Sequence, residues 1–376
     1  MNIADRLRSV RNALGMKLAD VSEKTGIGIS SLSEIENGKR EPMLIQLKKL
    51  SELYERPLSF FFETTEISSP ALLWREKPGN EIVVKQLEAK FTKWCRQYRN
   101  LEIWTNWPRL NSYEDLFVST YPKNFPEVRR IAHDTWKKMD LGARPGESLF
   151  RVMEEVYAVK VFHFTLEGDT SSACIYSENF GAAIMLNKNS KQWRRNYDLA
   201  HELFHLVTWK VRKDISPDGS LTQQDEQNAN VFASALLMPV EALREAVESF
   251  AQKDKDKDKD KMLLSIDAVD SIARQFGVSV DALLWRLCYV YGMPNEYVKN
   301  IIQGWRDEIL PQVLPRKSKT PDMLPDRYRD LANKALNNGL ISSKQFANYL
   351  AINVSEVYAR NIPQQFDDVQ INNPTC

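Results

Sequence analysis

Hydrophobic residues in the first 62 positions recur every three or four residues, which predicts a bundle of short helices. Ile3, Leu7, Val10 and Leu14 would lie on one face of a first helix, which ends at Gly15. Further helices are expected over residues 18–24, 30–36, 44–53 and from Pro57 onward. Turns that contain glycine or proline separate them. This part of the chain should therefore form an all-α bundle with its own core.

The central part of the chain changes from a helical period to a period of two. A long helical pattern with an aromatic stripe covers residues 82–104, and we interpret it as a spacer helix behind the polar linker 63–70. Two more helices are expected over residues 125–139 and 148–156. Alternating apolar positions then predict three short strands in a small antiparallel sheet. The strands are expected over residues 157–166, 172–176 and 182–186.

The rest of the chain is helical, apart from three polar segments. Helices are expected over residues 198–207, 224–236, 240–251 and 265–291, and in several short pieces after residue 300. Lys and Asp alternate strictly from 253 to 261, which leaves no apolar face and predicts a solvated, disordered insertion. A basic, proline-rich break spans residues 311–325, and the tail after Pro363 should be disordered.

Composition fits two or three globular domains. The chain has 376 residues, 43% of them hydrophobic, and no apolar run is long enough to cross a bilayer. It begins with a helical pattern rather than a signal peptide, and its four cysteines lack C-x-x-C spacing. The net charge of +1 means that the whole molecule is not a polycation. We expect a cytoplasmic protein with reduced thiols and no membrane partner.

The main chemical signal is the pair His201 and His205, with Glu202 between them. Histidines at i and i+4 share one face of a helix, so their imidazoles can converge on one tetrahedral metal ion. Glu202 projects to the side, where it can reach a metal-bound water, as in the H-E-x-x-H motif of zinc hydrolases. Two of the four histidines in the chain occupy this motif. The alternative is a pair of surface histidines beside a solvated glutamate.

Glu226 is the candidate for a third metal ligand. It follows His205 by 21 residues, enough chain to end one helix and bring a second helix back antiparallel. Its carboxylate would complete a His-His-Glu site and leave the fourth position for water. Asn230, one turn beyond Glu226, could accept the free N–H of a ligand imidazole. Taken alone, Glu226 would be an exposed helix carboxylate, and Asp225 is a neighbouring competitor.

These two segments resemble the ImmA/IrrE family of metallo-endopeptidases. The resemblance rests on His201-Glu-Leu-Phe-His205 and on Glu226-Gln-Asn-Ala-Asn-Val-Phe-Ala-Ser-Ala-Leu-Leu-Met-Pro239, and it extends over roughly half of the chain. It implies Zn²⁺ ligands at His201, His205 and Glu226, with Glu202 as the catalytic base. It also implies a protein substrate, a repressor of the helix-turn-helix type.

Two further expectations concern the substrate and the helix packing. We expect strand 182–186 to be the sheet edge that pairs with an extended substrate peptide. Phe204 departs from the small residue that is frequent at this position of the family, and it should tighten the packing of the helix.

The N-terminal bundle resembles the phage-repressor (XRE-type) helix-turn-helix family. Helix, tight glycine turn and helix within about sixty residues is the layout of that motif. The match rests on Arg11, Gly26, Ser31, the run Ile35-Glu-Asn-Gly38, Arg40 and Pro42. The resemblance implies that a helix starting near Ile29 enters the major groove of double-stranded operator DNA, and that Arg11 and Glu36 form a structural ion pair.

The predicted DNA contacts fall on this helix and just after it. They are Ile29, Ser30 and Glu34 at base edges, Ser31 and Ser33 near the backbone, and Lys39 and Arg40 at phosphates. Lys17 replaces the usual Ser or Thr N-cap, and Leu18 replaces a polar residue that approaches the phosphates. Residues 1–62 contain ten Lys or Arg against eight Asp or Glu, so DNA binding should be weak or depend on a homodimer. The alternative is a helical interaction domain that does not bind DNA.

The sequence thus predicts an α+β protein that is mostly helical. The expected parts are an N-terminal all-α helix-turn-helix bundle (1–62), a linker and spacer helix (63–112), a zincin-like metallopeptidase domain (113–299) and a C-terminal helical module (300–376). We expect a DNA-binding transcriptional regulator with a zinc-dependent endopeptidase domain that cleaves a repressor. The alternatives are a non-proteolytic repressor, whose peptidase-like domain is a sensor or scaffold, and an antitoxin-like regulator.

Overall fold

Five short helices form the N-terminal bundle in the computed structural model, which describes residues 2–54, 56, 58–62, 72–108, 111–168, 170–216, 220–250, 264–304, 306 and 320–360. The helices are α1 (Ile3–Ala13), α2 (Leu18–Thr25), α3 (Ile29–Glu36), α4 (Leu44–Leu53) and the 3-10 turn η1 (Leu58–Phe61). Leu7, Val21 and Leu32 meet in a core of their own, with Tyr54 fully buried among them. The predicted all-α bundle is therefore confirmed.

Local backbone features set the turns of this bundle. Gly26 ends α2 at φ +68°, a conformation that costs glycine nothing and strains other residues. The Lys17 side chain makes no cap, but Asp20 accepts a 2.7 Å hydrogen bond from the Lys17 backbone N–H and so completes the helix start. Arg11 and Glu36 form the expected ion pair, with two hydrogen bonds of 2.7 and 2.8 Å.

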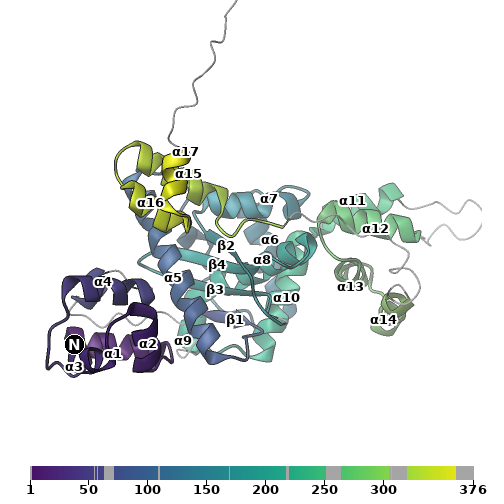
Figure 1. Ribbon diagram of the computed structural model, residues 1–376. Helices are drawn as coiled ribbons and strands as arrows, with labels where there is room; N and C mark the ends of the chain where they lie inside the picture. The colour runs from purple at the N-terminus through teal and green to yellow at the C-terminus, as the bar shows by residue number, and fades with distance from the viewer. Residues whose placement is uncertain are drawn as a thin grey trace, which may run out of the picture.

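A four-stranded sheet lies in the middle of the molecule (Figure 1). Its strands are β1 (Leu73–Arg75), β2 (Lys160–Phe164), β3 (Ser172–Ser177) and β4 (Gly181–Asn187), in the order β1-β3-β4-β2. β3 pairs antiparallel with both β1 and β4, whereas β2 pairs parallel with β4. The prediction of a purely antiparallel sheet is therefore wrong: the sheet is mixed, because the chain crosses from β2 past β4 to β3 before it returns.

The position predicted for strand 182–186 is also wrong. β4 lies in the interior of the sheet, between β3 and β2, and residues 182–187 are all buried. The end strands are β1 and β2. Alternating hydrophobicity indicates that a strand exists but does not say which strands flank it, and β1 comes from about a hundred residues earlier in the chain.

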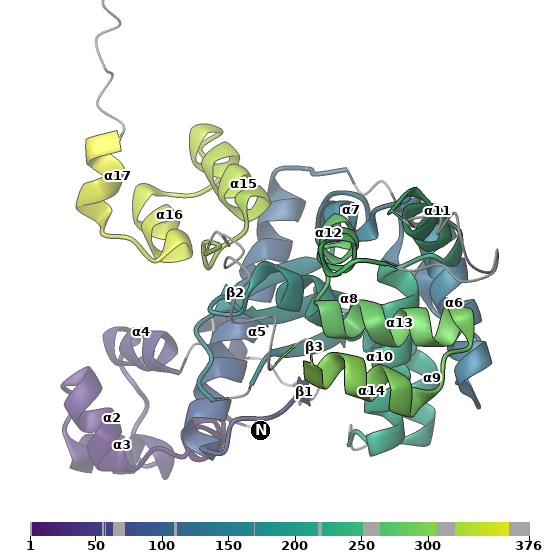
Figure 2. The same ribbon diagram turned by 90° about the vertical axis from the view of Figure 1, so that its right-hand side faces the viewer.

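Helices cover both faces of the sheet (Figures 1 and 2). On one face α5 (Glu81–Trp104) packs the stripe Phe91, Trp94 and Tyr98 against Phe162 and Phe164 of β2. The other face carries α8 (Gln192–Val207), which contacts β3 and β4, with α10 (Gln223–Leu237) and α6 (Phe125–Lys138) behind it. The aromatic stripe of the predicted spacer helix is thus part of a core shared with the sheet.

The remaining helices flank these two layers. They are η2 (Tyr113–Leu116), α7 (Pro145–Arg151) with the π-helical turn η3 (Val152–Val156), α9 (Trp209–Ile215), α11 (Val240–Phe250), α12 (Ile266–Phe276), α13 (Val280–Tyr291) and α14 (Asn295–Gly304). At the C-terminal end α15 (Asp326–Asn337), α16 (Ser343–Leu350) and α17 (Val354–Arg360) follow, and α15 packs on α5 through Tyr328 and Tyr98. The α+β, mostly helical class is confirmed.

Several predicted segments lie outside the described residues: the linker 63–70, the insertion 253–261, most of the break 311–325 and the tail after Pro363. The domain boundaries stay predictions. Within the described ranges, no helix combines the length and the apolar content needed to span a membrane.

Candidate metal centre

Helices α8 and α10 bring the three predicted ligands together. His201 and His205 lie one turn apart on α8, and Glu226 lies in the first turn of α10. The two Nε2 atoms are 3.3 Å apart. Oε2 of Glu226 is 3.2 Å from Nε2 of His201, and Oε1 is 3.5 Å from Nε2 of His205. One ligand atom from each residue therefore points to a common centre.

These distances and protonation states fit a tetrahedral Zn²⁺ site. With bonds of about 2.0–2.1 Å, two ligand atoms of tetrahedral zinc lie about 3.4 Å apart. Burial lowers the pKa of His201 to about 3, so this imidazole is neutral. Burial alone would raise the pKa of Glu226, but the adjacent His201 and His205 outweigh it and hold the pKa below its usual value. Two imidazoles and an ionised carboxylate are the donors of a catalytic zinc site.

Glu202 lies beside this cluster in a fully buried position. Ser172 of β3 donates a 2.6 Å hydrogen bond to its Oε1. In the part of the chain that the structure describes, no N–H or O–H group donates a hydrogen bond to its Oε2. Burial raises the pKa of the Glu202 carboxyl, and His205 and Ser172 partly oppose that rise. One carboxylate oxygen is thus held in place and the other is left to exchange a proton.

A second layer of polar residues surrounds His201. Oδ1 of Asn230 is 3.1 Å from Nδ1 of His201. Because Oδ1 can only accept, this contact places the proton on Nδ1 and leaves Nε2 for a metal. Arg75 donates to the same Oδ1 at 3.3 Å and pairs with the buried Asp198 at 2.6 Å. The orientation of His201 is therefore fixed through Asn230 and a chain of charged groups.

The sequence did not reveal Ser172, Arg75 and Asp198 as parts of this site. Ser172 lies in a predicted strand and Arg75 in a predicted linker, and only the pairing of β1 with β3 brings both to α8. Asp198 offered a signal, since it lies three residues before His201 and so on nearly the same face of the helix.

Asp225 is not part of the metal cluster. It accepts 2.7 Å hydrogen bonds from the backbone N–H and the hydroxyl of Thr222, and it pairs with Arg212 at 2.7 Å. These contacts close the first turn of α10 as a capping box. Phe204 points into the core, where its ring centroid lies 5.6 Å from that of Phe232.

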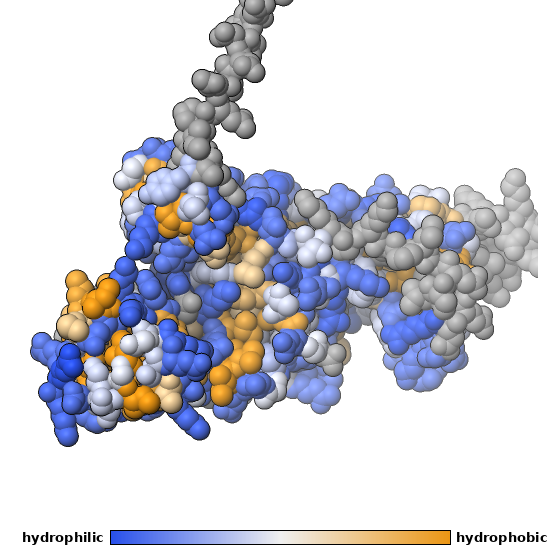
Figure 3. All heavy atoms as spheres, in the orientation of Figure 1, coloured by the Kyte–Doolittle hydropathy of each residue, from blue (hydrophilic) through white to orange (hydrophobic). Residues whose placement is uncertain are grey.

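Most of the predicted DNA-contacting residues lie on the solvent side of the N-terminal bundle. Ile29, Ser30, Glu34, Lys39 and Arg40 are exposed, whereas Ser31 and Ser33 are half-buried. The Ser31 hydroxyl lies 3.5 Å from Arg40, and the Ser33 hydroxyl lies 3.3 Å from Asn37. Figure 3 shows hydrophobic patches among hydrophilic residues on this bundle. Met43, Leu44 and Ile45 are exposed at the start of α4. The DNA contacts themselves stay predictions.

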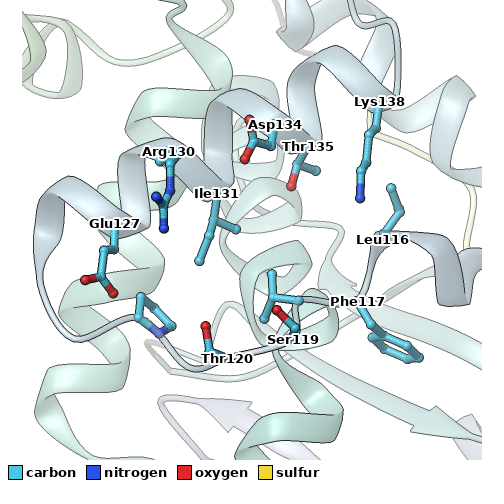
Figure 4. Close-up of a pocket in the computed structure, with 12 residues that line it drawn as sticks. Leu116, Phe117, Ser119, Thr120, Glu127, Arg130, Ile131, Asp134, Thr135 and Lys138 are labelled. Carbon is cyan, nitrogen blue, oxygen red and sulfur yellow. The ribbon is translucent and has the colours of Figure 1, made fainter.

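A cavity of about 420 Å³ lies between α6 and the segment 116–122 (Figure 4). Arg130 and Asp134 of α6 face this cavity, with Ser119 and Thr120 on the opposite side. No predicted site residue lines it, so it is separate from the cluster on α8 and α10.

Comparison with known proteins identifies two domains. Residues 7–61 match the helix-turn-helix family model, and residues 154–287 match that of the IrrE N-terminal-like domain, a peptidase family. No curated protein matches the chain. A solved structure, a Mycobacterium tuberculosis transcriptional regulator, is 16% identical with a TM-score of 0.30. The match covers 52% of this chain and 52% of that one, so the chain spans about half the length of that protein. A likeness of this degree carries no argument about function.

Proposed function

Because the chain joins a helix-turn-helix domain to an IrrE-like domain, we propose that it is a DNA-binding transcriptional regulator with a zinc-dependent endopeptidase domain. The proposed substrate is a repressor protein of the helix-turn-helix type. The observation that carries the proposal is the convergence of His201, His205 and Glu226, whose ligand atoms lie 3.2 to 3.5 Å apart beside Glu202.

Each residue has a distinct role in this proposal. His201, His205 and Glu226 hold Zn²⁺, which when bound supplies Lewis acidity toward water and the scissile carbonyl. Glu202 takes the proton of the attacking water on its free oxygen and passes it to the leaving amine. Ser172 keeps the Glu202 carboxylate in one orientation.

The decisive experiment compares the wild type with Glu202→Gln. Both proteins are loaded with Zn²⁺, their metal content is measured, and each is incubated with candidate repressors. We expect equal zinc content and cleavage slowed by about 10²–10⁴-fold in the variant, since general base catalysis is lost while the ligands remain. Zinc-loaded wild type that leaves every repressor intact would remove the support for proteolysis.

The burial of the site favours a second candidate function, a non-proteolytic regulator. His201 and Glu202 are 0% exposed and His205 is 1% exposed, whereas the Glu226 side chain is 31% exposed, so among the described residues of the cluster Glu226 is the one that solvent reaches. A closed metal site suits a sensor or a scaffold. This candidate predicts sequence-specific operator binding, with or without bound metal, and no cleaved product.

The proposed DNA contacts are tested separately by operator affinity at several salt concentrations. Ser30→Ala and Glu34→Ala change exposed residues of α3 and should alter sequence preference, whereas Lys39→Ala should weaken binding to all sequences and reduce the salt slope by about one. Glu52→Ala, exposed near the end of α4, serves as the control. If neither Ser30→Ala nor Glu34→Ala changes the affinity for the operator, this result would count against α3 as the reading helix. Sedimentation of the protein at the same salt concentrations tests the proposed homodimer.

A further inference from the structure

Strand β1 occupies the sheet edge next to β3, the strand whose Ser172 holds Glu202. The two strands pair antiparallel, with Leu73 opposite Cys174 and Arg75 opposite Ser172. An extended peptide that adds to a sheet edge forms the same kind of ladder. Residues that are directly opposite each other in such a pair have Cα atoms about 4.5–5.5 Å apart. β1 therefore fills the position that an extended substrate would take beside Glu202.

Alternate side chains of β1 hold the strand in this position. On the metal side Leu73 is 4% exposed and lies in the same core as Cys174, and Arg75 reaches Asp198. On the other side the Trp74 indole donates a 2.8 Å hydrogen bond to Glu88 of α5. This is how a peptide bound to a sheet edge is recognised: backbone pairing supplies affinity and separate contacts take its alternate side chains.

The backbone turns away from the edge immediately after Arg75. Glu76 has φ 58°, in the left-handed region that residues other than glycine rarely adopt. β1 is only three residues long, whereas a substrate must stay extended on both sides of the bond that is cleaved. The segment thus pairs like a substrate, but within the described residues its extended run ends at Arg75.

We propose that residues 72–76 are an internal pseudosubstrate, which fills the peptide-binding edge of β3 and keeps the metal centre latent until the strand is displaced. The claim that the metal centre is latent rests on the proposed function. The claim that β1 occupies the edge of β3 does not. An intramolecular segment acts at an effective concentration in the millimolar range, so a separate peptide competes poorly with β1 in the wild type.

Peptide binding tests occupation of the edge without catalysis. The probe is a fluorescein-labelled peptide with the sequence of residues 72–77, Leu-Leu-Trp-Arg-Glu-Lys, added to the full-length, zinc-loaded protein. Trp74→Pro removes the indole contact and a backbone N–H, and it should release β1. We expect this variant to bind the probe at least about tenfold more tightly than the wild type, with full zinc content at saturating Zn²⁺ and unchanged circular dichroism.

A disulfide that fixes β1 gives the opposite test. Trp74 and Ala173 are opposite each other on the face away from Glu202, so Trp74→Cys combined with Ala173→Cys can link the strands without touching the site. The oxidised double variant should not bind the probe, and reduction should restore binding. Trp74→Cys alone, treated with the same oxidant, is the matched control, and it should bind the probe as the reduced double variant does.

The same proteins are then given a pool of quenched fluorogenic peptides. Cleavage should rise in Trp74→Pro, disappear in the oxidised double variant and return on reduction. If probe binding changes as expected but no form cleaves any peptide, the proposed proteolysis fails and occupation of the edge stands. If wild type, Trp74→Pro and the oxidised double variant bind the probe equally, the pseudosubstrate is ruled out, whether or not the protein is a peptidase.

Discussion

The two faces of the central sheet both bury charged groups, but they use them differently. On the α5 face both oxygens of Glu102 are paired, with Arg327 at 2.6 Å and with Lys160 at 3.3 Å. On the α8 face Oε2 of Glu202 and Nδ1 of His205 are buried without a hydrogen-bond partner among the described residues. The α5 face therefore satisfies its buried carboxylate within the protein, whereas the α8 face leaves polar atoms for a group from outside.

This difference separates structural charges from functional ones. A buried polar atom without a partner costs about 1–3 kcal/mol, and Nε of Arg327 on the α5 face is also such an atom among the described residues. On the α8 face the unpaired atoms belong to a carboxylate and an imidazole, which a metal or a reaction can use. The His201, His205 and Glu226 cluster should thus be changed by mutation without loss of the fold. The Glu102, Lys160 and Arg327 cluster should show the reverse behaviour.

The largest expected effect is the loss of zinc on the α8 face. His205→Ala removes one of three ligands, and we expect zinc content to fall from about one ion per chain to a small fraction of that, with the melting temperature of the metal-free protein little changed. Metal analysis after dialysis gives the content. His133→Ala, an exposed histidine on α6, is the control and should keep its zinc. Full zinc content in His205→Ala would show that the ion binds elsewhere.

On the α5 face we expect a loss of stability instead. Glu102→Gln leaves Lys160 and Arg327 buried without a charge partner, and breaking a buried pair in this way costs about 3–5 kcal/mol. Urea unfolding of the metal-free protein measures the cost. Arg99→Gln removes the more exposed partner of Glu102 and should cost less than about 1 kcal/mol. An equal loss in both variants would mean that the buried cluster is not what stabilises this face.

The sequence could predict the features that depend on residues close together along the chain. The helices of the N-terminal bundle follow from the spacing of Leu7, Val10 and Leu14, and the pair His201 and His205 follows from the pitch of one helix. The prediction of Glu226 as a ligand required that a second helix pack against the first. Its place in the opening turn of an amphipathic segment indicated which face of that second helix it lies on. These predictions depend on the spacing of residues along a single helix, which is a local property of the sequence.

The order of the strands could not be predicted in this way. β1 has three residues, too few for a recognisable period, and its partner β3 lies about a hundred residues further on. The approach of Arg75 to Asn230 depends on this long-range pairing. The interior position of β4 and the parallel pairing of β2 depend on the crossing of the chain from β2 past β4 to β3, which the period of the strands does not indicate. The sequence therefore indicated the three residues of the proposed metal cluster, but not the residues that position and cover them.

The π-helical turn next to the α5 face provides a test by pH. Burial raises the pKa of Glu154 to about 8, and this effect outweighs the opposing contacts with Arg327, the Val161 backbone N–H and the Tyr98 hydroxyl, which is 3.5 Å away. A carboxyl whose pKa is higher in the folded than in the unfolded protein, where it is about 4.3, binds more protons when folded. The contribution of Glu154 to the free energy of unfolding should therefore fall as the pH rises from about 4.3 to 8, by a few kcal/mol.

Glu154→Gln should remove most of this slope, so the variant gains stability relative to the wild type as the pH rises toward 8. Unfolding in urea at pH 5, 6.5 and 8 gives the comparison. Glu155→Gln is the matched control, because Glu155 is the next residue, has the same side chain and is 54% exposed. If the slope of Glu154→Gln equals that of Glu155→Gln, burial of Glu154 does not govern the pH dependence.

The smallest expected effect concerns the layer behind the metal ligands. Asn230→Ala removes the acceptor that orients His201 but leaves all three ligands, so zinc affinity should fall by only about 10–100-fold. Asn230→Asp keeps an acceptor oxygen at the same place and should recover most of that affinity. Gln227→Ala, exposed on the same helix, is the control, and competition with a metal chelator measures the dissociation constants. Because Arg75 of β1 donates to the same oxygen, Trp74→Pro should reproduce part of the loss seen in Asn230→Ala. If releasing β1 leaves zinc affinity unchanged, the strand covers the site without helping to orient its ligand.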